Sequence, residues 1–160
     1  MPGRKYAGLI TYNFEPGPSA AASFPTGYFE KFPEDPTEMI QMNWVEGNMI
    51  PGSLWFSAVL VLKPTPENQL CHPGHIHEDW DEVLAFLSTN PADPENLGGE
   101  IDFTVGDEVY TFTKSVSVFL PRGLSHSPLI FKKVTTPIFM VGTGNPEKEY
   151  SQKFPEGWSW

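Results

Sequence analysis

Short runs of apolar residues, separated by prolines and glycines, make up most of the chain. Many of these runs carry the β-branched and aromatic residues that are typical of strands. The chain contains 17 prolines, and a proline inside a helix removes a hydrogen bond and clashes with the preceding turn. The pattern therefore predicts an all-β protein. The candidate strands are residues 39–47, 53–64, 82–88, 100–113, 115–121, 129–134 and 136–144.

Two of these segments carry more specific signals. Residues 53–64 form a continuous apolar run closed by Pro64, which suits a strand buried on both faces. Residues 100–113 contain Gly106-Asp107, which predicts a hairpin because glycine accepts the positive φ of a tight turn. The polar, proline-broken stretch 88–99 between strands predicts a long loop, and the sequence does not decide whether this loop is a lid.

The ends of the chain differ from its centre. Residues 1–37 are rich in Pro, Gly, Ser and Phe, and we expect an irregular arm with one short strand near residues 8–14. Residues 38–142 should form one β-domain, since 160 residues fit a single domain and no internal repeat is visible. We expect residues 143–160 to form a loose tail whose aromatic side chains can pack back onto the domain.

The amino-acid composition argues against some classes of binding partner. Ten basic and 20 acidic residues give a formal net charge of −10, which argues against nucleic acid and against an anionic membrane surface. Cys71 is the single cysteine and cannot form an internal disulfide. The start of the chain lacks the apolar core of a signal peptide, and no apolar run approaches the roughly 20 residues of a membrane helix. We therefore expect a soluble, cytoplasmic protein that binds a small molecule.

The stretch "HPGHIHEDWDE", residues 72–82, holds three of the four histidines. Strand side chains alternate between faces, so His75 and His77 project from one face. A turn through the acidic residues that follow can bring Glu82 to the same pocket. Two imidazoles and one carboxylate form three quarters of a divalent-metal site. The missing ligand must come from another strand, and His126 is the one histidine outside this cluster.

Two short motifs resemble those of the cupin family. The first is Gly74, His-x-His and Glu82 within "HPGHIHEDWDE", and the second is Pro-x-Gly-x-x-His within "FLPRGLSH", residues 119–126. The resemblance covers residues 44–141. Ser115 and Ile130 stand where the family usually has glycine and asparagine.

The resemblance implies a single cupin-type β-barrel, a double-stranded β-helix or jelly roll, with one divalent metal ion in its mouth. The implied ligands are His75, His77, Glu82 and His126. Mixed imidazole and carboxylate ligands suit Fe, Mn, Ni or Zn without choosing among them. Four protein ligands leave one or two positions open for catalysis. Homodimers are common in the family, so we also expect a homodimer.

Other side chains are candidates for a substrate pocket. Arg122 follows Pro121 in the second motif, and its guanidinium can bind a carboxylate of an acidic substrate or pair with a surface acid. Trp55 and Phe86 can line an apolar pocket beside the metal or belong to the core. Tyr110, as a pocket tyrosine, and the carboxylate of Glu78 are the candidates for a general base.

Three residues around the first motif have simpler interpretations. His72 precedes Pro73-Gly74 and fits a loop at the barrel rim. Cys71 fits a buried, unreactive position. Trp80 lies in the charged turn and fits the mouth of the pocket.

We interpret the protein as a metal-dependent enzyme for a small organic molecule. The family resemblance favours a non-haem iron dioxygenase, with an isomerase, a decarboxylase or a lyase as alternatives. The other class of function is a non-catalytic module that binds a metal or a metabolite. Fold alone does not decide between these classes.

Overall fold

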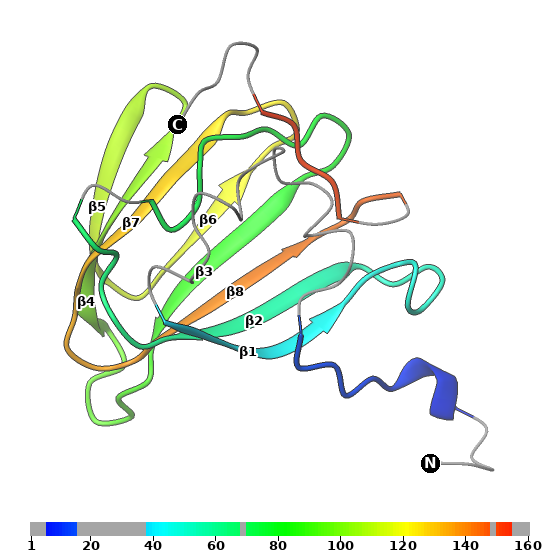
Figure 1. The fold of residues 1–160 in the computed structure, drawn as a ribbon, viewed down its shortest axis with the longest axis horizontal. Coiled ribbons are helices and arrows are strands. Elements are labelled where there is room, and N and C mark those ends of the chain that lie inside the picture. The colour runs from blue at the N-terminus through cyan, green and yellow to red at the C-terminus, as the bar shows by residue number, and fades with distance from the viewer. Residues whose placement is uncertain (1–5, 16–37, 68–69, 148–149, 155–160) are drawn as a thin grey trace.

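Antiparallel strands make up almost all regular structure of the protein. The structure is a computed structural model that describes residues 6–15, 38–67, 70–147 and 150–154 (Figure 1). One short 3₁₀ turn, η1, precedes the strands. The elements are η1 (Ala7–Leu9), β1 (Met39–Val45), β2 (Trp55–Val61), β3 (Glu82–Ser88), β4 (Asn96–Val105), β5 (Glu108–Lys114), β6 (Val116–Leu120), β7 (His126–Val134) and β8 (Ile138–Gly144).

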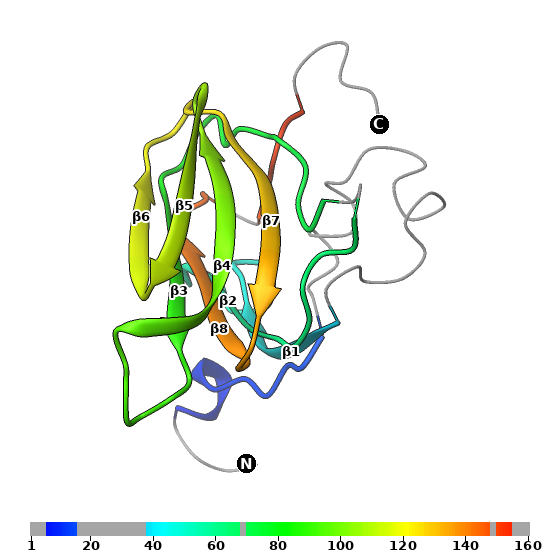
Figure 2. The same ribbon diagram turned by 90° about the vertical axis from the view of Figure 1, so that its left-hand side faces the viewer.

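The strands form two sheets that face each other (Figure 2). The five-stranded sheet has the order β1-β2-β8-β3-β6, and the three-stranded sheet has the order β5-β4-β7. Their facing side chains form the main core, and burial of these apolar groups stabilises the pair of layers. The all-β prediction is confirmed. The fully buried core residues include Val61, Phe86, Leu97, Ile101, Phe103, Phe131 and Ile138.

Each of the candidate strand segments between residues 39 and 144, apart from the His-x-His segment, contains a strand, and the hairpin lies where glycine predicted it. Gly106 has φ +64° and turns β4 into β5. The strand expected near residues 8–14 is wrong. Residues 7–9 form the turn η1, and the next residues run irregularly. Among the described residues, this segment makes one backbone hydrogen bond to the neighbouring strand β1, from Trp44 N–H to the Asn13 carbonyl at 3.1 Å, and one bond does not make a ladder.

The loop between β3 and β4 lies far from the histidine motif. Glu82 is the first residue of β3 and Ser88 is the last. At about 3.3 Å per residue, the two ends of the strand are roughly 20 Å apart. The loop follows Ser88, so it does not cover the end of the sheet that carries Glu82 (Figure 1).

A further, irregular segment extends the three-stranded sheet beyond β7. Cys71 N–H donates to the Leu129 carbonyl at 2.9 Å, and His75 and His126 exchange two backbone hydrogen bonds of 3.0 Å. The predicted His-x-His strand is therefore reduced to single bridges along β7. On its other side, Ile76 exchanges two hydrogen bonds of 2.9 Å with Lys153. The C-terminal segment thus lies beside the histidine motif.

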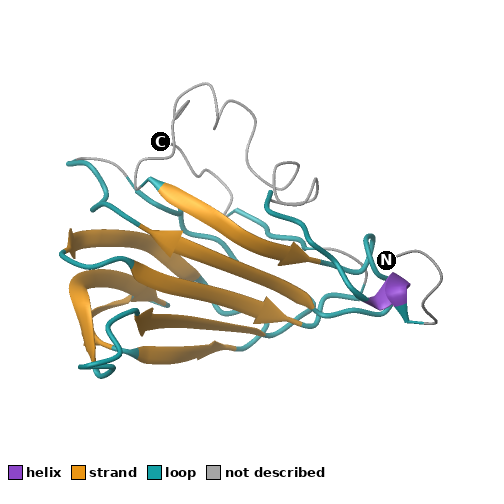
Figure 3. Ribbon diagram, turned by 90° about the horizontal axis from the view of Figure 1, so that it is seen from below, coloured by secondary structure: helices purple, strands orange, loops and turns teal. Residues whose placement is uncertain are grey.

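The N-terminal segment extends away from the two sheets (Figures 1 and 3). Its large apolar side chains face solvent, and so do two on the edge strand β1. In the described residues no helix is long and apolar enough to span a membrane. The exposed apolar residues of this region are Leu9, Ile10, Tyr12, Phe14, Ile40 and Met42.

The homodimer stays a prediction, and this exposed apolar surface supplies its test. Replacing Leu9, Ile10 and Phe14 together by serine should shift sedimentation from dimer to monomer, because the change removes apolar area available to a second copy. Exposed Val109 and Phe119, replaced in the same way, form the matched control. An unchanged dimer in the triple variant contradicts a role of the arm in association.

Candidate metal centre

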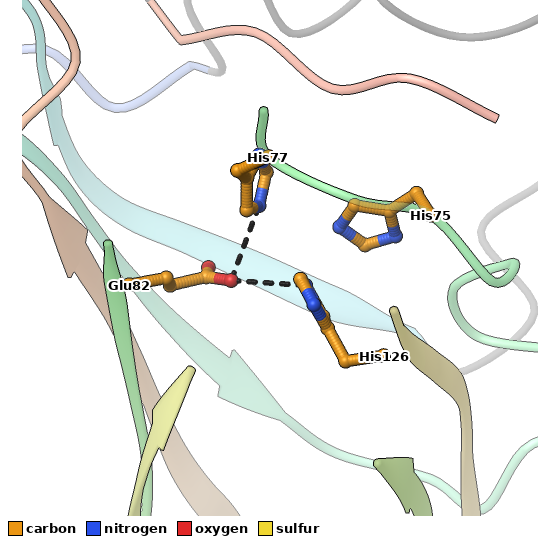
Figure 4. Close-up of side chains that lie close together, drawn as sticks. All are labelled: His75, His77, Glu82 and His126. Atoms are coloured by element: carbon orange, nitrogen blue, oxygen red, sulfur yellow. Dashed lines mark hydrogen bonds and ion pairs between the residues drawn. The ribbon is translucent and has the colours of Figure 1, made fainter. Parts of the chain in front are cut away.

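Four side chains that the sequence motifs named converge in the interior. His75 and His77 come from the segment beside β7, Glu82 begins β3, and His126 begins β7 (Figure 4). All four are buried, and one nitrogen or oxygen atom of each lies within 4.8 Å of the corresponding atoms of the others. The two sheets therefore bring together residues that are up to 51 positions apart in the chain.

Backbone carbonyls fix the orientation of all three imidazoles. Nδ1–H of His75 donates to the Pro73 carbonyl at 2.9 Å, and Nδ1–H of His126 donates to the Leu124 carbonyl at 3.0 Å. His77 does the same to the Ser151 carbonyl at 2.6 Å. A carbonyl accepts only, so Nδ1 carries the proton, and in the neutral ring Nε2 keeps its lone pair. Backbone acceptors hold metal-binding histidines in this way.

The Nε2 atoms meet a carboxylate at close range. Glu82 Oε2 lies 3.2 Å from His77 Nε2 and 3.1 Å from His126 Nε2 (Figure 4). His126 Nε2 is buried, and no hydrogen bond satisfies it. Lone pairs of nitrogen and oxygen repel one another at this distance unless a proton or a metal ion lies between them. The donor set therefore fits a divalent metal ion with imidazole and carboxylate ligands.

The ionisation of these groups suits metal binding. Burial raises the pKa of Glu82, but the contacts with His126 and His77 outweigh burial and lower the pKa to about 2. Burial holds the pKa of His75 well below its ordinary value. At neutral pH the site therefore presents a carboxylate and a neutral imidazole, which are the forms that bind metal ions.

His72 lies beside the cluster rather than at an exposed rim. Its ring contacts that of His75 in a tilted arrangement, with 4.7 Å between ring centres, and its backbone pairs with Leu129. Burial lowers the pKa of His72 to about 4, so this ring is also neutral at pH 7. The interpretation of His72 as a loop residue at the rim misses this neighbourhood, because the bridge to Leu129 depends on a strand more than 50 residues away.

An aromatic cluster supports the far side of His77. The ring of Trp80 is fully buried and stacks on His77 with 3.8 Å between ring centres. Trp55 and Tyr150 pack against Trp80 at 5.5 and 5.7 Å. Gly144 makes this possible, because a Cβ at that position would overlap the Trp80 ring. Trp80 is thus a support for a ligand, not a residue of the pocket mouth.

The C-terminal segment completes this support. The Ser151 carbonyl accepts from His77 Nδ1–H and from Trp80 Nε1–H, the latter at 3.2 Å. Tyr150 is buried in the aromatic cluster, and burial followed by the nearby Glu82 carboxylate holds its pKa well above the ordinary value. In the sequence, only the aromatic residues of this segment indicated that it packs onto the domain.

A cavity of about 190 Å³ opens next to the cluster. Two of the four candidate ligands, His75 and Glu82, are part of its wall. The remaining wall is mostly aromatic, aliphatic and sulfur-containing. The other lining residues are Met39, Gln41, Trp44, Trp55, Ser57, Cys71, His72, Leu84, Ser127, Leu129, Met140, Gly142 and Tyr150.

The candidate pocket residues have different places. Trp55 lines the cavity. Phe86 lies in the main core, 6.0 Å from Phe103 between ring centres. Tyr110 is exposed on β5 and donates its hydroxyl to Glu108. The cavity wall, as far as the described residues define it, therefore includes Trp55 but neither Phe86 nor Tyr110.

Arg122 also lies outside the cavity wall. Its side chain is exposed and binds Asp81 in a bidentate way, with Nε–Oδ1 at 3.2 Å and Nη2–Oδ2 at 3.1 Å. Of the two interpretations of Arg122, substrate binding or pairing with a surface acid, the structure shows the second. The contact joins the two motifs across the turn that precedes Glu82.

No family model and no curated protein matches the sequence. Solved structures resemble the fold at low identity. An oxalate oxidase is 16% identical, with a TM-score of 0.47, 88% of this chain and 70% of that chain covered. A cupin domain from Schizosaccharomyces pombe is 13% identical, with a TM-score of 0.46 and coverage of 68% and 64%. A protein from Klebsiella pneumoniae with a double-stranded β-helix domain is 15% identical, with a TM-score of 0.44 and coverage of 71% and 76%.

The two antiparallel sheets, and the cluster that joins His75, His77 and Glu82 of the first motif to His126 of the second, agree with the arrangement that the cupin resemblance of the motifs implies. The chain spans less than two thirds of the length of the S. pombe cupin domain.

The Ser151 contact predicts that the C-terminal segment supports metal binding. A chain ending at residue 149 should bind Zn²⁺ about 10-fold to 100-fold more weakly than the full chain, because His77 loses its carbonyl acceptor. Zn²⁺ affinity is measured by competition with a chromophoric chelator. A chain ending at residue 154 keeps Ser151 and is the control. Equal affinities in both truncations contradict this role.

The lowered pKa of His72 predicts acid sensitivity of the metal-free protein. The unfolded ring takes up a proton near pH 6.5 and the folded ring only near pH 4, so stability is lost as pH falls through this window. Chelator-treated wild type should lose on the order of 2 kcal/mol more than His72→Gln between pH 7 and pH 4.5. Urea unfolding at both pH values measures the difference. Parallel losses in the two proteins contradict the prediction.

Proposed function

We propose that the protein is a metal-dependent enzyme that acts on a small organic molecule. One observation carries the proposal: His75 and Glu82 belong both to the candidate metal site and to the wall of a cavity. A substrate in this cavity meets the ligand cluster directly. His77 and His126 complete the cluster and are not among the described residues that line the cavity.

The protein's own residues have distinct roles in this proposal. Imidazole nitrogens and the Glu82 carboxylate hold the ion, and the Pro73, Leu124 and Ser151 carbonyls keep the rings in the binding tautomer. The apolar wall excludes water from the bound substrate. A divalent metal supplies Lewis acidity, or redox chemistry if it is iron or manganese.

Oxygen-dependent chemistry with iron is the form of the proposal that the cupin resemblance favours. Isomerase, decarboxylase and lyase chemistry use the same donor set and are the second candidates. Related metal sites occur in proteins with several activities, so the donor set does not choose among them. A non-catalytic binding module is the alternative from another class. If the protein is such a binding module, a small molecule that binds to it should be recovered chemically unchanged.

Metal content is the first test. Elemental analysis of the purified wild type should give about one divalent ion per chain, and His77→Ala should lose it, because three ligands bind far more weakly than four. His72→Ala removes a histidine outside the cluster and should keep the metal. Absence of metal from wild type after reconstitution with Fe²⁺, Mn²⁺, Ni²⁺ and Zn²⁺ would falsify the proposal.

The identity of the ion directs the activity test. For an iron protein, oxygen consumption is measured while a library of small organic molecules is added, with His77→Ala as the inactive control. For a zinc or nickel protein, the same library is followed by NMR for isomerisation, decarboxylation or elimination. A metal-loaded protein that binds a molecule and returns it unchanged supports the binding module instead.

A further inference from the structure

The cavity beside the candidate metal site has an apolar, sulfur-rich end. Met39 and Cys71 lie there with 4.0 Å between their sulfur atoms. Met140 lines the same cavity, and it pairs with Phe86, four residues along β3 from Glu82. Four residues of strand correspond to roughly 13 Å. The cavity therefore runs from a polar wall at Glu82 to an apolar end at the methionines.

The polar side chains of the wall offer neutral groups to a ligand, including the buried indole N–H donors of Trp44 and Trp55, which have no hydrogen-bond partner in the part of the chain that the structure describes. Gln41 uses its amide nitrogen on the Asn43 carbonyl at 2.5 Å, the Ala58 carbonyl at 3.0 Å and Ser57 Oγ at 3.2 Å. No lysine or arginine is among the described residues that line the cavity. Arg122, the cation of the second motif, is held outside by Asp81.

These features decide which ligands the cavity accepts. An ionised carboxylate in this cavity is disfavoured, because it loses hydration and meets no cationic side chain in the described wall, whose free indole donors are neutral. An aromatic ring gains contacts with sulfur and with aromatic walls. The volume of about 190 Å³ also matches a single ring, because a cavity of about 150 Å³ holds benzene.

We infer that the substrate is a small uncharged molecule of about the size of one substituted aromatic ring. Its metal-binding oxygen atoms lie at the wall of His75 and Glu82, and its apolar remainder lies against Met39, Cys71 and Met140. This inference rests on the proposed function for the position of the oxygen atoms. The preference for an uncharged remainder rests on the cavity wall alone.

A matched pair of metal-binding probes tests the inference. 4-Methylcatechol and 3,4-dihydroxybenzoate share the two hydroxyls that bind a metal and differ by a methyl against a carboxylate of similar size. Titration calorimetry with the Zn²⁺-loaded protein should give at least 10-fold tighter binding of 4-methylcatechol. The affinities of both probes for Zn²⁺ in solution are the reference. Equal or tighter binding of the carboxylate probe overturns the inference.

A second pair separates this inference from the proposed function. Toluene and benzoate need no metal, and NMR titration of the chelator-treated protein should detect toluene with at least 10-fold preference. Met140→Trp should abolish toluene binding by filling the apolar end, and the exposed substitution Val109→Trp is the control. Failure of Fe²⁺, Mn²⁺, Ni²⁺ and Zn²⁺ all to bind sinks the proposed function alone. Preference for benzoate, or toluene binding unchanged in Met140→Trp, sinks the inference about the substrate.

Discussion

The convergence of electron-rich atoms around Glu82 is the constraint on which the rest of the structure depends. A buried carboxylate with two imidazole nitrogens at 3.1 and 3.2 Å is stable only when positive charge is shared among them. Removing one partner of such a buried group costs about 3–5 kcal/mol. The strands that bear these groups are held in register by ladder hydrogen bonds, so the fold and the site cannot be separated.

The environment of His77 illustrates how distant parts of the chain serve this constraint. A single carbonyl at Ser151 accepts from His77 and from the Trp80 indole. The indole in turn stacks on the imidazole and occupies space that Gly144 leaves open. The hydrogen bond to Ser151 and the contact with the Trp80 ring therefore fix the orientation of the His77 imidazole. A histidine side chain that is already held in its binding orientation loses less conformational entropy when it binds an ion, which favours tight binding.

Sequence patterns were informative where the signal is local. Strand runs, the Gly106 turn and the spacing of His75, His77 and Glu82 depend on residues close together in the chain, and the structure shows the strands and the turn in place. The cluster itself brings in His126 through the pairing of two segments, which the motif resemblance anticipated. The Ser151 contact and the cavity wall depend on long-range register, which no local pattern encodes.

The substrate-pocket candidates show the same limit. Phe86 and Glu82 lie on the same strand with even spacing, so both face inward. The inward-facing side chain of Glu82 lies in the candidate metal cluster, whereas that of Phe86 lies in the core between the two sheets. Arg122 was judged by its chemistry, but its direction is set by Asp81 across the motif turn. Residue type indicates what a side chain can do, and only the packing decides what it meets.

The charge of the candidate site and the character of the cavity belong together. A divalent ion held by one carboxylate would retain about one positive charge, and the neighbouring His72 and His75 are neutral at pH 7. This positive charge would favour one anionic oxygen atom of a substrate beside His75 and Glu82. It would not stabilise a second anionic group at the apolar end of the cavity. The apolar end then selects by shape and desolvation rather than by charge. An acidic protein with a net charge of −10 can in this way hold a polar group without a basic side chain in the cavity wall that the structure describes.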